Sequence, residues 1–254
     1  MIGRILLVNL ILLAIFMTAA FLVAKSRNRF DTVDTCWGLG FILAAWSVEL
    51  QQPSKRSLLV AVLVSIWGFR LASHIYRRSQ KKGDDPRYQE IVNKWQGNIW
   101  PRAYVSIFLT QAALIWIVSL PIVMISNHVI SGLSWLIWLG TLGWLAGFAI
   151  EVIADRQLEK FLKLKDRPKV LQTGLWRYSR HPNYAGELKL WWGIGIMGLA
   201  ASWGWLGLIG PLTISYLIIF VSGIPPIERR RAKDSEYQIY MAKTSPLLLL
   251  PPRK

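Results

Sequence analysis

Long apolar runs alternate with short basic segments along the whole chain of 254 residues. Seven runs stand out: 2–24, 33–48, 58–76, 104–125, 133–153, 188–201 and 203–221. Several of them reach the roughly 20 residues that a helix needs to cross a bilayer core. Because strand-like alternation of apolar and polar positions is absent, helices are the spanning form to expect. The pattern predicts an all-α membrane protein with about seven transmembrane helices.

The sixth run is short, and we expect its helix to begin near Asn183, inside a polar segment. The first run is too long for a removable signal peptide and lacks a small-residue cleavage site, so we expect it to remain as the first helix. No repeat, low-complexity tract or soluble domain interrupts the pattern. We therefore expect a single integral-membrane domain over residues 1–254.

Basic residues are concentrated in alternate loops. They cluster in four segments, 25–29, 77–102, 156–180 and 229–254. The loops near 126–132 and 201–203 carry no charge except that of His128 when it is protonated. This alternation is the positive-inside pattern, and it predicts an outer N-terminus. The segments predicted to be cytoplasmic are 25–32, 77–102, 154–182 and the C-terminus. Lys55 and Arg56 fall on the outer side, against the rule.

The net charge of +16 does not indicate a nucleic-acid partner, because its distribution follows the membrane loops. A hydrophobic content of 53% with 14 Trp residues fits a polytopic membrane protein. The single Cys36 excludes an internal disulfide and a Cys-based metal site. The three His residues are scattered, so we predict no metal centre. The chain has no GxGxxG fingerprint, so no Rossmann domain is expected.

Three polar segments have features of their own. The loop 77–102 carries Gly83 and Pro86, which favour a turn between one helix end and a new polar helix. The fifth helix is expected to continue without a break as far as Pro168. The tail 228–240 is interpreted as one amphipathic helix, followed by an apolar segment, 245–252, that we expect to dip back towards the bilayer.

The segment 174–187 is the most informative part of the chain. Seven of its polar residues, just before an apolar run, are candidates for a binding site: Arg177, Tyr178, Arg180, His181, Asn183, Tyr184 and Glu187. Guanidinium groups match phosphate oxygens in shape and charge, so this segment predicts an anion site at the mouth of a membrane helix. Such a site suits a phosphorylated or carboxylated cofactor held over a lipid-soluble substrate. The alternative for Arg177 and Arg180 is simple positive-inside anchoring.

Charges within or beside apolar spans are costly and are functional candidates. Five such residues are Glu49, Arg70, Glu151, Asp155 and Glu187. Glu151 and Asp155 share one helix face, as do Asn183 and Glu187. A carboxylate and an amide on one face can recognise a carboxamide such as nicotinamide. The alternative is structural ion pairing, with Arg156, Lys189 or Arg70 as the partners.

These motifs resemble those of a known superfamily. Gly174–Glu187 is similar to the C-terminal signature of membrane-bound steroid 5α-reductases and their bacterial relatives. The segments 31–40 and 84–88 and the C-terminal Glu-Arg-Arg…Tyr…Tyr pattern resemble the bacterial DUF1295 branch, and the resemblance covers nearly the whole chain in order. The Arg-His-Pro-Asn-Tyr core also resembles sterol Δ14- and Δ7-reductases. A reduced form of it is similar to isoprenylcysteine carboxyl methyltransferases.

The resemblance implies an NADPH site, with a cofactor-binding region over residues 101–254. It implies nicotinamide contacts from Asn183 and Glu187, further cofactor contacts at the end of the fifth helix, and an adenosine cover from the 77–102 loop. The cofactor-binding residues that it implies are Arg87, Tyr88, Glu151, Asp155, Arg177, Tyr178, Arg180, His181, Asn183, Tyr184, Glu187, Arg229, Arg230 and Tyr240. In the steroid enzymes, Asn stands at the position of Glu151 and His at that of Arg229.

The resemblance also implies a substrate side over residues 1–100. The steroid enzymes carry Gln-Glu-Leu-Pro where this chain has the segment 48–53, which keeps Glu49 and carries Gln52 before Pro53. Trp67 stands where they use a Tyr to bind the substrate carbonyl, and an indole N–H donates but relays no proton. This departure weakens the case for steroid specificity. A protonated Glu49 would donate to the substrate oxygen, unless it instead pairs with Lys55 or Arg56.

These inferences predict an NADPH-dependent oxidoreductase that reduces an activated C=C bond of a steroid-, isoprenoid- or lipid-like substrate. Its partners would be membrane lipids and that substrate, and its place a bacterial inner membrane with the cofactor on the cytoplasmic side. One rival is an S-adenosylmethionine-dependent membrane methyltransferase, for which Glu49→Gln should be harmless. The other is a non-catalytic membrane protein that binds a lipid or a partner.

Overall fold

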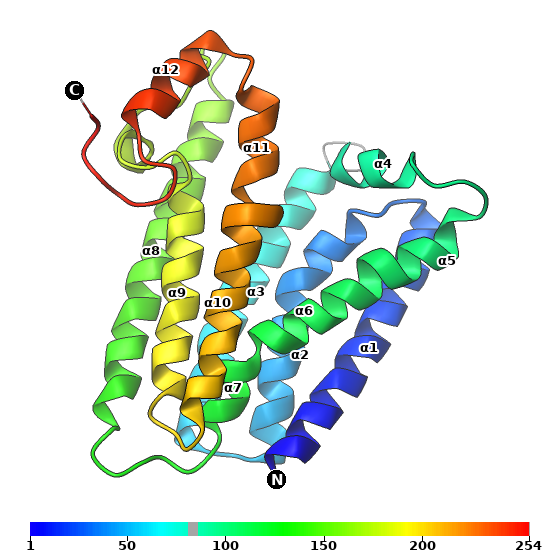
Figure 1. Cartoon of the computed structure of the whole chain (residues 1–254), viewed down its shortest axis with the longest axis vertical. Helices are drawn as coiled ribbons and strands as arrows, with labels where there is room; N and C mark the ends of the chain where they lie inside the picture. Colours follow the sequence, from blue (N-terminus) through cyan, green and yellow to red (C-terminus); the bar gives the residue numbers. More distant parts are fainter. Residues whose placement is uncertain (81–85, 254) are drawn as a thin grey trace. The chain divides into compact units, whose positions relative to one another are not determined.

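The computed structural model describes residues 1–80 and 86–253 (Figure 1). Gly83, with the start of the 84–88 motif, lies outside the described residues. The chain forms two compact units. Unit 1 comprises Met1–Ser131 and Gly198–Ile209, and unit 2 comprises Gly132–Met197 and Gly210–Lys254. The described residues form helices and contain no strand beyond an isolated bridge between Val129 and Ala201, which confirms the predicted all-α class.

Six helical segments of the described residues are long and apolar enough to cross a membrane. They are Ile2–Arg27, Thr32–Gln51, Lys55–Gln80, Ile99–Ile125, Trp135–Leu162 and Gly204–Arg231. The remaining predicted span corresponds to α9, Pro182–Gly198, which has 17 residues. It begins beside Asn183, as the sequence predicted. The protein is therefore a polytopic helical membrane protein.

Unit 1 is built on α1 (Ile2–Arg27), α2 (Thr32–Gln51) and α3 (Lys55–Gln80), with α1 against α2 and α2 against α3. The short α4 (Pro86–Val92) follows. The pair α2–α3 is close-packed because both helices place glycine at the contact. A Cβ added at Gly38 would lie 2.6 Å from the Gly68 carbonyl oxygen, so no larger residue fits there.

Both predicted spans near 104–125 and 203–221 are irregular helices. The first consists of α5 (Ile99–Ala103), the π-helical η1 (Tyr104–Leu109), α6 (Thr110–Val118) and α7 (Leu120–Ile125). The second consists of the 3₁₀ turn η3 (Gly204–Leu208), α10 (Ile209–Tyr216), the π-helical η4 (Leu217–Val221) and α11 (Ile224–Arg231). Hydropathy detects apolar length but not helical winding, so neither interruption was predicted.

The loops of unit 1 meet at its ends in the pairs that the charge pattern predicts. At one end the uncharged loops join, because Ile130 N donates to the Ala200 carbonyl over 2.9 Å. Arg56 also lies there, with its guanidinium 3.3 Å from the Asn127 carbonyl oxygen. At the other end the basic segments 25–32 and 77–102 are joined by the side chain of Arg29. The cytoplasmic identity of the basic end stays a prediction.

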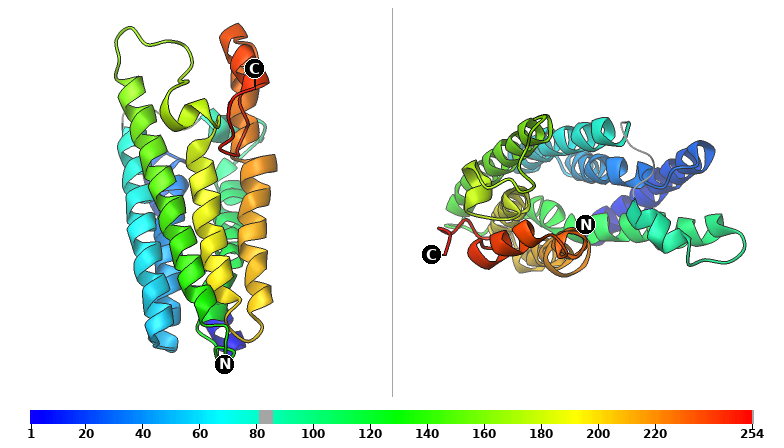
Figure 2. Two further views of the ribbon diagram at one scale, coloured as in Figure 1. Left: turned by 90° about the vertical axis from the view of Figure 1, so that its left-hand side faces the viewer. Right: turned by 90° about the horizontal axis from the view of Figure 1, so that it is seen from above.

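In unit 2, α8 (Trp135–Leu162) packs antiparallel against α9, as Figures 1 and 2 show. The contact is again made by glycines: a Cβ added at Gly147 would lie 2.5 Å from Leu190 N. One added at Gly186 would lie 2.6 Å from Glu151 N. This contact fixes the first turns of α9 at the level of Glu151 on α8.

Two expectations for the polar parts of unit 2 were wrong. Helix α8 ends at Leu162 rather than continuing to Pro168, because Arg167 donates to the Leu162 carbonyl over 3.0 Å and caps the helix end. The tail forms two helices instead of one, α11 and α12 (Ser235–Lys243). The side chain of Asp234 accepts from Glu236 N over 3.1 Å and starts the second helix.

Candidate functional site

The loop that opens the signature segment is fixed to the end of α8. It contains the 3₁₀ turn η2 (Gly174–Arg177). Leu175 N donates to the Gln157 side chain over 3.0 Å, and the Trp176 indole donates to the Ala154 carbonyl over 3.1 Å. Gly174 has φ of 61°, a left-handed conformation that favours glycine. These bonds place the loop directly before α9.

Arg180 binds the tail of the chain. Its Nε lies 2.8 Å from Glu228 Oε1, and its Nη1 donates to the carbonyls of Met241 over 3.0 Å and Thr244 over 2.5 Å. The side chain is 8% exposed. The sequence assigned Arg180 to phosphate, and that role stays a prediction. The structure shows an internal partner for each nitrogen of its guanidinium group.

His181 is buried beside the same carboxylate. Its Nε2 lies 3.2 Å from Glu228 Oε1, and its ring stacks on Tyr184 at 5.7 Å. Burial lowers the pKa of His181, and this effect outweighs the opposing influence of Glu228. The ring is therefore neutral at pH 7, and Nε2–H donates to Glu228.

Tyr240 joins α12 to the signature loop. Its hydroxyl donates to the carbonyl of Trp176 and, over 3.1 Å, to that of Ser179. Burial raises the pKa of Tyr240, so the hydroxyl keeps its proton and remains a donor. The tail after α12 runs along the loop as well, since Leu250 N donates to the Tyr178 carbonyl over 3.1 Å. Whether its apolar side chains enter a bilayer stays a prediction.

The first two turns of α9 differ from this loop. Asn183 and Glu187 are half-buried and lie one turn apart on α9. Within the part of the chain that the structure describes, the amide of Asn183 forms no hydrogen bond. On α8 the carboxylate of Glu151 is buried and Asp155 is half-buried one turn later. Glu151 on α8 thus lies beside the first turns of α9, and its role in binding a cofactor stays a prediction.

The other cations predicted for this site lie on the surface of unit 2. Arg177 and Tyr178 are exposed, and the Arg177 guanidinium has no hydrogen bond or ion pair among the described residues. Arg229 and Arg230 are exposed in the last turn of α11. Arg229 makes a single bond of 3.3 Å, to the Pro225 carbonyl. Arg177 and Arg229 therefore have donors available to an anionic ligand.

The predicted substrate residues lie in unit 1. Glu49, near the end of α2, accepts from the Ser57 hydroxyl and from Ser54 N at 3.4 Å. Neither Lys55 nor Arg56 pairs with it among the described residues. Gln52 accepts from the Ser126 hydroxyl at 3.4 Å.

Trp67 is 1% exposed and packs edge-on against Phe41, with ring centroids 5.7 Å apart. It is a core residue of the α2–α3 pair, and this packing does not test the substrate role that its position implies.

Arg87 and Tyr88 bind an acid that the sequence analysis did not single out. Both donate to Asp34, each over 2.6 Å, from α4 to the first turn of α2. Asp34 lies 15 residues before Glu49, which corresponds to about 22 Å along the helix. The sequence offered one signal for this contact. It has an acidic residue at the start of an apolar helix, and the same chain contains an Arg-Tyr pair. Their role over an adenosine group stays a prediction.

The fold and the polar ends of its helices define a class: a polytopic α-helical membrane protein whose signature loop binds its own C-terminal tail. The chain belongs to the DUF1295 family, described as proteins of unknown function, whose model matches residues 20–244. This confirms the resemblance to that family.

Among curated proteins, the chain is similar to one from Schizosaccharomyces pombe described as "Uncharacterized protein C594.04c". The two are 25% identical over 208 residues, covering 68% of this chain and 57% of the relative. The chain thus matches a little over half of that relative's length. No solved structure matches the chain.

Proposed function

We propose that this protein is a membrane-embedded, NADPH-dependent reductase acting on an activated C=C bond of a lipophilic substrate from the bilayer. The observation that carries the proposal is the pair Asn183 and Glu187 on the first turns of α9. Asn183 supplies an amide with no hydrogen bond among the described residues, and Glu187 supplies a carboxylate one turn later. In this proposal the basic ends of the helices face the cytoplasm of a bacterial inner membrane.

The donor set fits a nicotinamide dinucleotide. A carboxamide needs one acceptor and one donor, which Glu187 and Asn183 supply. The phosphates of the dinucleotide need cations, and Arg177 and Arg229 are exposed cations on unit 2. The loop before α9 is held in place by Arg180, His181 and Tyr240. In this proposal these residues do not bind the cofactor but position Asn183, so that it can bind without rearrangement.

When bound, NADPH would supply a hydride, and Asn183 and Glu187 would hold its nicotinamide group. In this proposal a protonated Glu49 would donate a proton to the substrate oxygen. Ser57 and Ser54 hold the carboxyl group of Glu49 in one orientation.

A thermal-shift titration of detergent-purified protein tests the proposal. NADPH should raise the melting temperature, because a ligand that binds only the folded state stabilises it. Asn183→Ala should weaken NADPH binding about tenfold or more, since it removes a specific hydrogen-bonding amide, and should leave the ligand-free melting temperature unchanged. Lys189→Ala is the matched control, because this exposed side chain lies on another face of α9.

Two results would contradict the reductase. A shift with S-adenosylmethionine instead of NADPH would indicate a membrane methyltransferase. No shift with NADPH, NADH or S-adenosylmethionine would indicate a non-catalytic protein. Equal weakening by Asn183→Ala and Lys189→Ala would remove the assigned role of Asn183.

A further inference from the structure

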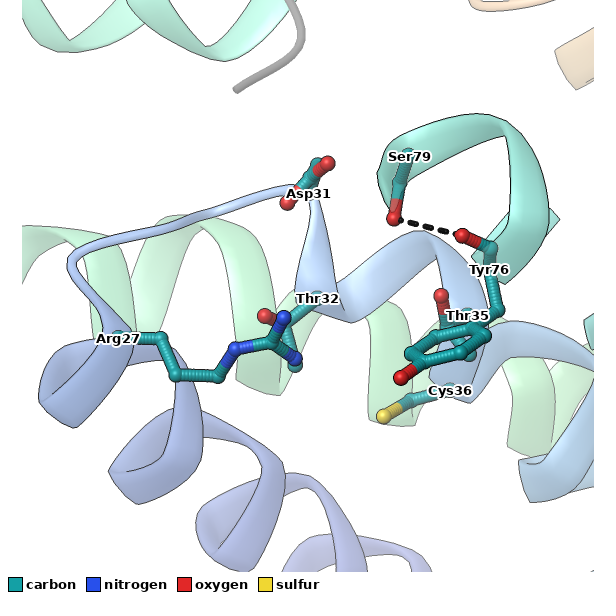
Figure 3. Close-up of a pocket in the computed structure, with 7 residues that line it drawn as sticks. All are labelled: Arg27, Asp31, Thr32, Thr35, Cys36, Tyr76 and Ser79. Atoms are coloured by element: carbon teal, nitrogen blue, oxygen red, sulfur yellow. Dashed lines mark hydrogen bonds between the residues drawn. The ribbon is translucent and has the colours of Figure 1, made fainter. Parts of the chain in front are cut away.

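Unit 1 contains a small pocket at its basic end, apart from every residue assigned above (Figure 3). Its volume is about 110 Å³, and seven residues from the ends of α1, α2 and α3 line it: Arg27, Asp31, Thr32, Thr35, Cys36, Tyr76 and Ser79. Figure 3 shows the Arg27 guanidinium, the Tyr76 hydroxyl and the Cys36 thiol directed into the space between the helices. The pocket therefore presents a cation and several small polar groups to whatever enters it.

The pocket wall has an uncompensated positive charge. The Asp31 carboxylate is paired with Arg29 through bonds of 3.1 and 2.6 Å, so its charge is already balanced. Arg27 has no such acid: no ion pair or hydrogen bond involves its guanidinium within the described residues. The first turn of the 20-residue α2 adds the positive end of a helix dipole. The pocket consequently favours an anion.

The free donors in the wall match oxygen acceptors. The hydroxyls of Thr35 and Tyr76 form no hydrogen bond among the described residues, whereas Ser79 donates to the Tyr76 carbonyl over 3.2 Å. A cation and two free hydroxyls around one small volume are the donor set for a tetrahedral oxyanion. Drug-sized ligands occupy cavities of roughly 300–1,000 Å³, so this pocket takes one charged group and not a whole dinucleotide or sterol.

We infer that this pocket binds a phosphate group, in the form of a phospholipid headgroup or of free phosphate. Arg27 ends one candidate membrane span and Tyr76 lies near the end of another, and the ends of membrane-spanning helices are where lipid headgroups would be met. A lipid held there would fasten the ends of α1, α2 and α3 to one another. The inference does not depend on the proposed reductase activity.

The test uses the full-length protein in a detergent without phosphate and three probes: inorganic phosphate, dihexanoyl-phosphatidylglycerol and the matching diacylglycerol, which lacks phosphate. Thermal shift gives a dissociation constant for each. Arg27→Gln should weaken binding of the phosphate probes about tenfold or more, because it removes a charge-assisted hydrogen bond. Tyr76→Phe should weaken it about three- to tenfold, the effect of one neutral hydrogen bond.

Lys25→Gln is the matched control, since Lys25 is an exposed cation in the same last turn of α1 that does not line the pocket. It should change the dissociation constant less than about twofold. Binding of phosphatidylglycerol alone identifies a lipid headgroup, and binding of inorganic phosphate alone identifies the free ion. Both results support the inference.

Three results would overturn it: no shift with either phosphate probe, an equal shift with diacylglycerol, or equal weakening by Lys25→Gln and Arg27→Gln. NADPH titration of Arg27→Gln separates this site from the proposed cofactor site. If that variant loses NADPH as strongly as phosphate, the pocket belongs to the cofactor and the inference fails. Failure of the reductase proposal would instead appear as absent NADPH binding with phosphate binding intact.

Discussion

The loop 174–181 and the first turns of α9, residues 183–187, are neighbours in the chain and are both rich in polar side chains, yet their bonding differs. In the loop, the charged Arg180 and the buried His181 are held by Glu228, and Tyr240 binds two loop carbonyls. At the start of α9, the amide of Asn183 has no hydrogen bond in the described part of the chain. The motif therefore contains polar groups that join the loop to the tail of the chain, and one amide, that of Asn183, which is available to a ligand.

The largest test of this comparison is Arg180→Met. The loss of Arg180 leaves the Glu228 carboxylate without its main partner and leaves two carbonyls without a donor. We expect a loss of about 3–5 kcal/mol, the usual effect of breaking a buried ion pair, measured as a fall in melting temperature. Limited proteolysis should also cleave the tail after α12. Arg177→Met, at an exposed cation in the same loop, should change stability by less than about 0.5 kcal/mol.

Gly186→Ala tests whether the α9 segment also depends on packing. The new Cβ would lie 2.6 Å from both Glu151 N and the Gly147 carbonyl oxygen, and neither backbone atom can rotate away. We expect a loss of about 1–3 kcal/mol from overpacking, seen by thermal denaturation. The control is Gly143→Ala on α8, whose Cβ would meet Gly193 Cα at 3.6 Å, an ordinary contact. If the two variants have the same melting temperature, the close approach of α8 and α9 is not rigid.

Tyr240→Phe removes only the hydroxyl that α12 donates to the loop. The carbonyls of Trp176 and Ser179 lose their shared donor, so we expect a loss of about 1 kcal/mol. NADPH affinity should change little, because in our comparison Tyr240 holds the loop and contacts no ligand. Tyr178→Phe, at an exposed ring, should have no effect on the melting temperature. A loss of NADPH affinity in Tyr240→Phe without a loss of stability would reverse the role given to this residue.

The smallest expected effect is a pH dependence caused by His181. Burial lowers its pKa in the folded protein, so the unfolded chain binds more protons than the folded one below the ordinary value of about 6.5. Stability should therefore fall as the pH falls through about 6.5 and level off below the folded pKa. Melting curves across this range should show the slope in the wild type and a smaller one in His181→Gln. An unchanged slope in His181→Gln would show that another group titrates.

The helical class, the family and the start of α9 could all be predicted from the sequence, because each depends on local features: apolar length, charge in alternate loops and a contiguous motif. The C-terminal end of α8 and the division of the tail were predicted wrongly. Both depend on single side chains, Arg167 and Asp234, that compete for backbone groups at a helix end. A hydropathy pattern does not detect such competition, so it could not predict these helix ends.

Two further features of the structure also could not be predicted. Asp34 binds Arg87 and Tyr88 from more than 50 positions away, and the π-helical turns η1 and η4 interrupt apolar runs that look uniform. The proposed phosphate pocket could not be predicted from the sequence either, because the ends of three helices form its wall.

By itself, the sequence determined that the protein spans a membrane with helices and that its polar residues gather at the helix ends, since burial in lipid requires both. The tertiary structure decided which of those polar residues are already bonded to the protein. Arg180 meets Glu228 from 48 positions away, and Tyr240 meets Ser179 from 61. Such pairing depends on which helix ends pack together, and that arrangement determines whether a side chain in the motif holds the fold or stays available to a ligand.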